Sequence, residues 1–295
     1  MNPTNPINPS NPSSPFRFWL SLVLLVLSFV TLYHHTLYKM GLDWLRDDNY
    51  SHGFLIPLIA GFLLWQERDK LSNAKVSPSN AGLFILLAGL CLFVAARTGA
   101  ELFTERFSML MVIWGGVLFI LGRQHARIAW IPIAYLIFMI PLPAIIWNQV
   151  AFPLKLFATK LATGAITFLS IPVYREGNII HLANTTLEVV DACSGIRSLT
   201  SLLAISAAFA LITDHSRLKK WVLFLSAVPI AIFVNILRLT VTAALAHRYG
   251  SEVAQGFLHE MSGLMVFAVA IVSLFGIHVL LQKIGSKPEH PDEKS

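Results

Sequence analysis

Long apolar runs recur along the whole chain and constrain its fold more than any other feature. A membrane-spanning helix needs about 20 apolar residues. Of the 295 residues, 55% are hydrophobic and only 13% are charged, about half the charged fraction of a soluble domain. The sequence therefore predicts an all-α polytopic membrane protein with about eight transmembrane helices, at residues 18–38, 53–66, 80–97, 107–122, 128–148, 193–213, 221–246 and 260–282.

Basic residues cluster in four connections, at residues 66–75, 122–127, 214–220 and 283–287. Cytoplasmic loops of membrane proteins carry an excess of Lys and Arg. Placing these four inside makes eight spans alternate consistently, with both termini cytoplasmic, in the plasma membrane (the cell inner membrane). The net charge of +6 is thereby explained by topology, and we expect no nucleic-acid partner.

This topology holds only if residues 150–170 do not cross the membrane. Lys155, Thr159, Thr163 and Thr167 recur every four residues in that segment and form one polar stripe on a helix. The stripe favours an interfacial helix. A ninth span with the stripe facing the bundle is the alternative.

The remaining segments lie between or outside the spans. Residues 179–182 and 186–190 are rich in β-branched residues and flank 183–185, which predicts a short external β-hairpin. Residues 1–16 repeat Asn-Pro and should form a disordered, extended lead. We therefore divide the chain into this lead, a transmembrane domain at 17–283 and a charged cytoplasmic tail at 284–295.

Three chemically reactive side chains fall at a similar depth near the external face. Cys193 opens the sixth span and His259 precedes the eighth. Arg238 lies 17 residues after Trp221 in the seventh span, roughly 26 Å into a core of ~30 Å. A cation or a histidine lowers the pKa of a nearby thiol, a histidine can move its proton, and a guanidinium can stabilise an oxyanion. The alternatives are an inert packing cysteine, an arginine reaching the headgroups and an interfacial histidine.

Five stretches resemble motifs of the exosortase/archaeosortase family. They are "NYSHGFLIPL" (49–58), "VYREGNIIHL" (173–182), "ACSGIRSL" around Cys193, "PIAIFVNILRLT" around Arg238 and "GFLHEMSG" around His259. The likeness extends in order from about residue 40 to 275. It implies a membrane cysteine protease and transpeptidase that cleaves C-terminal sorting tails of exported proteins, often alongside exopolysaccharide production. Such a tail has a Pro-Glu-Pro-like motif, a transmembrane helix and a basic cluster.

The resemblance also implies roles for individual residues. Cys193 would be the nucleophile that forms an acyl thioester, Arg238 a proton donor or charge stabiliser, and His259 a base or transition-state stabiliser. A histidine at this third position points to the bacterial branch of the family.

Five further residues are candidates for substrate binding. Arg197 could pair with a glutamate of the sorting motif, or instead anchor to headgroups. Asn235 could orient Arg238, or join helices. Tyr50, Ser51 and His52 could line the cleft, or belong to an interfacial belt.

Other functions remain open at this point. A membrane acyltransferase could use the same cysteine. Thiol redox exchange needs a second thiol, and Cys91, the other cysteine, is expected in mid-span. A non-enzymatic transporter or polysaccharide-export component is a further alternative, although transporters tend to show internal repeats and we find none. The chain has no His-Glu-x-x-His motif, so we expect no metal and no cofactor. Membrane lipid is an expected partner.

Overall fold

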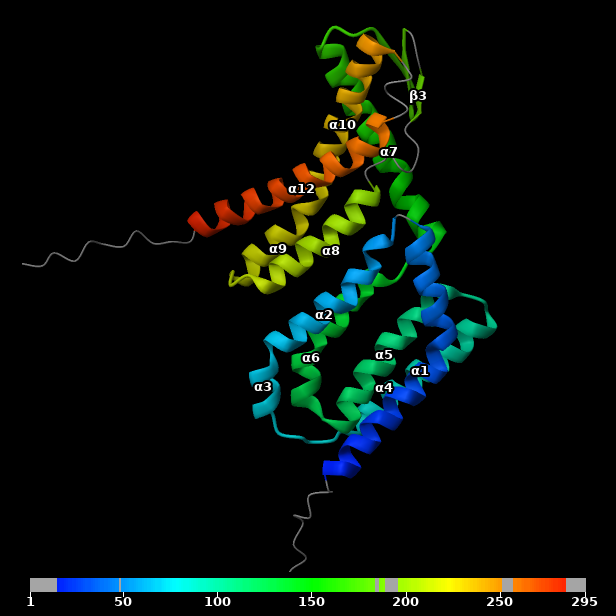
Figure 1. Ribbon diagram of the computed structural model, residues 1–295, viewed down its shortest axis with the longest axis vertical. Helices are drawn as coiled ribbons and strands as arrows, with labels where there is room; N and C mark the ends of the chain where they lie inside the picture. The colour runs from blue at the N-terminus through cyan, green and yellow to red at the C-terminus, as the bar shows by residue number, and fades with distance from the viewer. Residues whose placement is uncertain (1–14, 48, 184–185, 189–195, 251–256, 285–295) are drawn as a thin grey trace, which may run out of the picture.

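The part of the chain that the structure describes is mostly helical (Figure 1). The computed structural model describes residues 15–47, 49–183, 186–188, 196–250 and 257–284. Its helices are α1 (Pro15–Arg46), α2 (Leu55–Gln66), α3 (Arg68–Asn73), α4 (Asn80–Thr98), α5 (Leu102–Ile120), α6 (Arg123–Tyr135), α7 (Ala144–Phe168), α8 (Ile196–Ile212), α9 (Arg217–Leu225), α10 (Ala227–Tyr249) and α12 (Phe257–Lys283), with 3-10 turns η1 (Ser51–Phe54) and η2 (Leu136–Met139).

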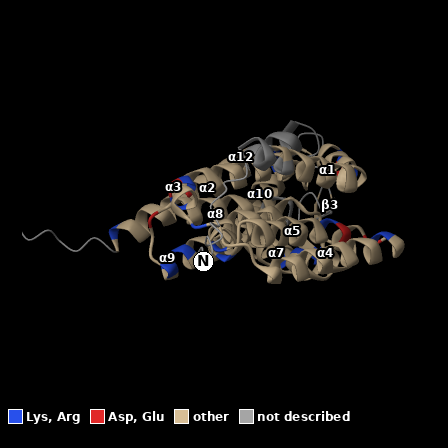
Figure 2. Ribbon diagram, turned by 90° about the horizontal axis from the view of Figure 1, so that it is seen from below, with Lys and Arg blue, Asp and Glu red and all other residues tan. Residues whose placement is uncertain are grey.

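Several described helices are long and apolar enough to cross a membrane. They are α4, α5 and the continuous unit of α9 and α10, Arg217–Tyr249, with a fourth span if the bent pair of α6–η2 and α7 counts as one. Most residues along the ribbon are uncharged, and the basic and acidic residues lie in short stretches such as those at α3 and α9 (Figure 2). The prediction of a helical membrane protein is confirmed, and the number of eight spans stays a prediction.

Two helices, α4 and α5, pack as a close antiparallel pair because glycines line their contact. A Cβ atom built on Gly82 would lie 2.2 Å from the backbone nitrogen of Phe119, and one on Gly115 would lie 2.7 Å from that of Leu86. Small residues let membrane helices approach to backbone contact. Glu101 begins α5 by accepting hydrogen bonds from the next turn, including the amide of Thr104 at 2.6 Å.

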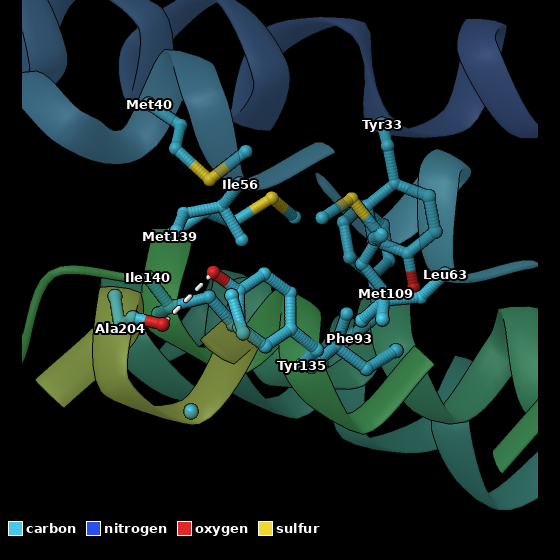
Figure 3. Packing of buried hydrophobic residues seen from close by; sticks show 14 residues of the cluster. Tyr33, Met40, Ile56, Leu63, Phe93, Met109, Tyr135, Met139, Ile140 and Ala204 are labelled. Atoms are coloured by element: carbon cyan, nitrogen blue, oxygen red, sulfur yellow. Dashed lines mark hydrogen bonds between the residues drawn. The ribbon is translucent and has the colours of Figure 1, made fainter. Parts of the chain in front are cut away.

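The first hydrophobic core joins the N-terminal helices to α8 (Figure 3). Tyr33, Met40, Ile56, Leu63, Phe93, Met109, Tyr135, Met139 and Ile140 are its largest buried members. The hydroxyl of Tyr135 on α6 donates to the carbonyl of Ala204 on α8 at 3.1 Å. This bond connects the N-terminal half of the chain to the helix that follows Cys193.

The predicted span at 128–148 is wrong as a single helix. The chain leaves helical geometry at residues 140–143, and the two helical parts meet at 77°. Pro141 and Pro143 explain the break, because proline lacks an amide hydrogen and disfavours helix in the residue before it. The predicted helix at 150–170 is therefore part of α7, which begins at Ala144.

The three threonines of the polar stripe on α7 form hydrogen bonds within their own helix. The hydroxyls of Thr159, Thr163 and Thr167 each donate to the carbonyl four residues earlier, at 2.7, 2.8 and 2.9 Å. Thr159 is fully buried. An adjacent face of α7 packs along α10, through Ala158 and Ala162. A position of α7 in the membrane interface stays a prediction.

The segment after α7 forms three antiparallel strands, so the predicted two-stranded hairpin is incomplete. The strands are β1 (Val173–Glu176), β2 (Ile179–Leu182) and β3 (Thr186–Glu188), in the order β1-β2-β3. Charged residues at the end of β1 hid it from the pattern, although Gly177, with φ of 59°, marks a two-residue turn typical of hairpins. Ile180 and Leu182 bury one face of the sheet against α7 and α10. Residues 189 and 190 of the predicted second strand lie outside the described residues.

Helix α10 is the centre of the C-terminal half. It contacts α7 on one side and α8, α9 and α12 on the others. The helices α8, α9, α10 and α12 share one buried cluster, to which they contribute Leu202, Leu223, Val234 and Leu274, respectively. In Figure 1, α7 and α10 run side by side at the top, with the sheet beside their upper ends.

Candidate active site

Arg238 lies in the middle of α10, which the sequence makes helical through a long run of aliphatic residues. Its side chain is half-buried. Asn235 lies one turn earlier and is only 2% exposed. Among the described residues, the Nδ2 amide of Asn235 has no hydrogen-bond partner. An unpaired buried donor costs about 1–3 kcal/mol, so a ligand that accepts a hydrogen bond from this amide would be stabilised. Two further buried nitrogens, Arg106 Nε and His125 Nδ1, likewise have no partner among the described residues.

The other two predicted catalytic residues are Cys193 and His259. Cys193 precedes α8 and His259 belongs to α12, and both of these helices pack on α10. Cys193 lies outside the described residues, three positions before α8 begins at Ile196. His259 is the third residue of α12. Arg197 is the second residue of α8. The side chains of Arg197 and His259 are not among those described.

Residues 49–54, which we name the strap, connect α1 to α2 and contain three predicted substrate-binding residues. Tyr50 is 8% exposed, and its hydroxyl accepts a hydrogen bond from the amide of Leu142 at 3.2 Å. Its ring centroid lies 6.0 Å from that of Trp147. Ser51 is exposed. Tyr50 therefore covers the proline break between α6 and α7, while Ser51 faces outward.

His52 connects the strap to α8. Its Nδ1 atom lies 3.1 Å from the Oγ atom of Ser201, in the second turn of α8. Burial lowers the pKa of His52, and hydrogen bonds to the backbone of Phe138 and Asn49 offset part of that effect. The hydroxyl of Thr200 donates to the carbonyl of Asn49 at 3.4 Å. The strap, which contains the start of the stretch "NYSHGFLIPL", therefore lies against α8, the helix that follows Cys193.

Two buried charged residues at the start of α5 escaped the sequence interpretation. Arg106 is 2% exposed and forms an ion pair with Asp43, in the last turns of α1. Its neighbour Glu105 is 5% exposed and accepts hydrogen bonds from Thr36 at 2.6 Å and Arg97 at 3.3 Å. Charges beside an apolar segment need partners. The Glu-Arg dipeptide at the start of the fourth apolar run was the available signal.

No group of three or more metal-ligating side chains occurs among the residues that the structure describes. The histidine of the strap is instead occupied by hydrogen bonds to the protein.

Residues 44–276 match the family model described as transmembrane exosortase (Exosortase_EpsH). The chain belongs to this family. A relative named "Probable archaeosortase E", from Methanocaldococcus jannaschii, is 30% identical over 159 residues, which is 51% of this chain and 80% of the relative. No solved structure matches the chain.

The family match extends across every candidate position. It begins in the last turn of α1, before the strap, and ends within α12, after His259. It therefore includes Arg238 and Asn235 on α10, and Arg197 and Ser201 on α8. The exosortase family resemblance predicted from five motifs is confirmed.

Proposed function

We propose that this exosortase family member is a membrane-embedded cysteine transpeptidase acting on exported proteins. Its substrates would carry a C-terminal tail with a Pro-Glu-Pro-like motif, a transmembrane helix and a basic cluster. Family membership supports a membrane transpeptidase role in general. The observation that carries the residue assignment is the half-buried Arg238 beside the buried amide of Asn235, which has no partner in the part of the chain that the structure describes. Both lie in an apolar helix, where polar groups mark function by default.

The proposed reaction has two acyl transfers. The thiolate of Cys193 attacks the carbonyl carbon of the scissile peptide bond and forms a tetrahedral oxyanion. The oxyanion collapses to an acyl thioester as the carbon–nitrogen bond breaks, and the leaving amine takes the proton that His259 removed from the thiol. An acceptor nucleophile, or water, then attacks the thioester and releases the thiol.

Two groups on α10 suit the charge that develops in this reaction. Arg238 keeps its positive charge at any physiological pH, so it can stabilise the thiolate and the oxyanion. The Nδ2 amide of Asn235 is a donor without a partner among the described residues. Donors held in place before the reaction stabilise an oxyanion by several kcal/mol. We assign Asn235 to the substrate carbonyl.

The substrate would approach from the external face of the inner membrane. Its own helix would diffuse laterally to the bundle and present the scissile bond at the outer interface, with both termini of the enzyme in the cytoplasm. Arg197 would pair with the glutamate of the motif, and the exposed Ser51 would contact the peptide beside Tyr50. The association with exopolysaccharide export belongs to the same proposal.

A reporter assay in membranes tests this function. A tagged protein ending in a Pro-Glu-Pro motif, an apolar helix and a basic cluster is co-expressed with wild-type enzyme or with Cys193→Ala. We expect the wild type to remove the tail and the variant to leave it intact. Equal processing by both would contradict the nucleophile assignment, and consumption of a lipid acyl donor in place of the tail would indicate an acyltransferase.

A further inference from the structure

The first residues of the strap are fixed to the end of α1. The carboxylate of Asp47 accepts hydrogen bonds from the backbone amide and the side-chain amide of Asn49 at 2.9 and 2.7 Å. The amide of Tyr50 donates to the carbonyl of Asp47, and the amide of Asp47 donates to that of Asp43, both at 2.9 Å. Asp43 is itself paired with the buried Arg106. The strap is therefore anchored to the end of α1, which is itself paired with α5.

The imidazole of His52 uses both of its nitrogens within the protein. A neutral imidazole has one N–H donor and one acceptor nitrogen. The backbone of Phe138 and Asn49 also hydrogen-bonds to the imidazole. In the tautomer with its hydrogen on Nε2, Nδ1 accepts the hydroxyl hydrogen of Ser201, 3.1 Å away. A side chain engaged in this way on α8, η2 and the strap has little capacity left for a peptide substrate.

The contact reaches α8 at a chemically sensitive place. Ser201 and Thr200 lie in the second turn of the helix, and both bond to the strap. The segment that carries Cys193 enters this helix directly. Because a helix is rigid over two turns, fixing Ser201 also fixes the point from which that segment departs.

We propose that His52 is a positioning residue, which holds α8 through Ser201 and so sets the approach of the nucleophile Cys193. The inference rests on the proposed function and replaces substrate contact as the role of His52. A misplacement of about 1 Å at a reacting group can cost 10²-fold in rate. A side chain that never touches the substrate can therefore control the chemical step.

The test compares four substitutions in a Cys91→Ser background, where Cys193 is the only thiol. His52→Ala, His52→Asn, His52→Gln and Ser201→Ala are purified in detergent and checked for a monodisperse elution profile. Two assays are run on each variant. The first measures the alkylation rate of Cys193 by a small maleimide across pH, and the second measures the kcat and KM of reporter processing.

Substitutions that break the contact should lower rates without weakening substrate binding. His52→Ala and Ser201→Ala should each reduce kcat and the alkylation rate about 5- to 10-fold, the equivalent of one hydrogen bond, with KM nearly unchanged. The double variant, which combines His52→Ala with Ser201→Ala, should show a kcat and an alkylation rate no lower than those of either single variant. His52→Asn should restore most of the rate because its Oδ1 can accept where Nδ1 did, whereas His52→Gln should not.

The outcomes separate this inference from the proposed function. A raised KM with an unchanged alkylation rate would show that His52 contacts substrate and would overturn the inference. Equal alkylation rates for all four variants would overturn it as well, even where the wild type processes the reporter. If the wild type does not process the reporter but alkylation follows the Asn-over-Gln order, the positioning role stands and the proposed substrate fails.

Discussion

Replacing Gly53 with alanine should disrupt the strap from within. A Cβ atom on Gly53 would lie 2.3 Å from Nε1 of Trp44, whereas ordinary contact begins at 3.4 Å, so the indole must move by about 1 Å. The indole is held by a 2.9 Å hydrogen bond from Nε1 to the carbonyl of Met139 and by an edge contact with Phe54. Losing that bond costs about 1 kcal/mol, and overpacking adds about 1–3 kcal/mol. We expect a total of about 2–4 kcal/mol.

The assay measures heat stability in detergent and the reporter processing rate. The matched control is Gly41→Ala in α1, where the new Cβ meets nothing within 4 Å and a gain of about 0.5–1 kcal/mol is expected. Adding Trp44→Phe to Gly53→Ala should recover part of the loss, since the smaller ring frees space. Wild-type stability and rate in Gly53→Ala would refute the close contact between strap and indole.

Three further predictions follow from single features. Gly115→Ala should destabilise the α4–α5 pair by about 1–3 kcal/mol, while the neighbouring Gly116→Ala, which meets nothing within 4 Å, should not; heat stability of the two variants compares them. Burial raises the pKa of Glu101, but hydrogen bonds from Thr104 and from the amide of Phe103 lower the pKa by more, so the net shift is downward. The ionised carboxylate of Glu101 stabilises the fold above its unfolded pKa of 4.5, and this stabilisation is lost as pH falls through the folded pKa. Glu101→Ala should therefore lower the free energy of unfolding by about 1 kcal/mol near neutral pH and leave it unchanged in acid. A series of unfolding curves across pH measures the difference. Asn235→Leu should raise heat stability, by removing an unpaired buried amide, yet lower kcat about 10²-fold or more; a stability loss with full activity would contradict the role of the amide.

The sequence was sufficient for the helices because apolar length decides them. Predicted segments 80–97 and 107–122 correspond to α4 and α5 within a few residues. It was insufficient at 128–148, where hydrophobicity continues through Pro141 and Pro143. There the backbone chemistry of proline, not the apolar pattern, sets the helix end. Strand β1 was missed for the opposite reason, since its charged end interrupts the β-branched pattern on which the hairpin was read.

The site required contacts that no local pattern contains. His52 and Ser201 are 149 positions apart, and Asp43 and Arg106 are 63 apart. Motif resemblance could select His52, but it could not show that the imidazole bonds to α8. A short sequence motif reports residue types, whereas the partner of a hydrogen bond depends on how distant helices pack.

Buried polar groups lie both near the strap and on α10, in different surroundings. Near the strap, Glu105 has two described partners and Arg106 pairs with Asp43, although the Nε atom of Arg106 has no hydrogen-bond partner among the described residues. These bonds hold α1, α4 and α5 together. On α10, Asn235 is equally buried, and its amide has no partner among the described residues. Buried donors are rarely left unpaired in a stable fold, because the cost is not offset unless a ligand completes the bond. The N-terminal helices therefore support the strap, and the amide of Asn235 on α10 is the donor that we propose for the substrate carbonyl.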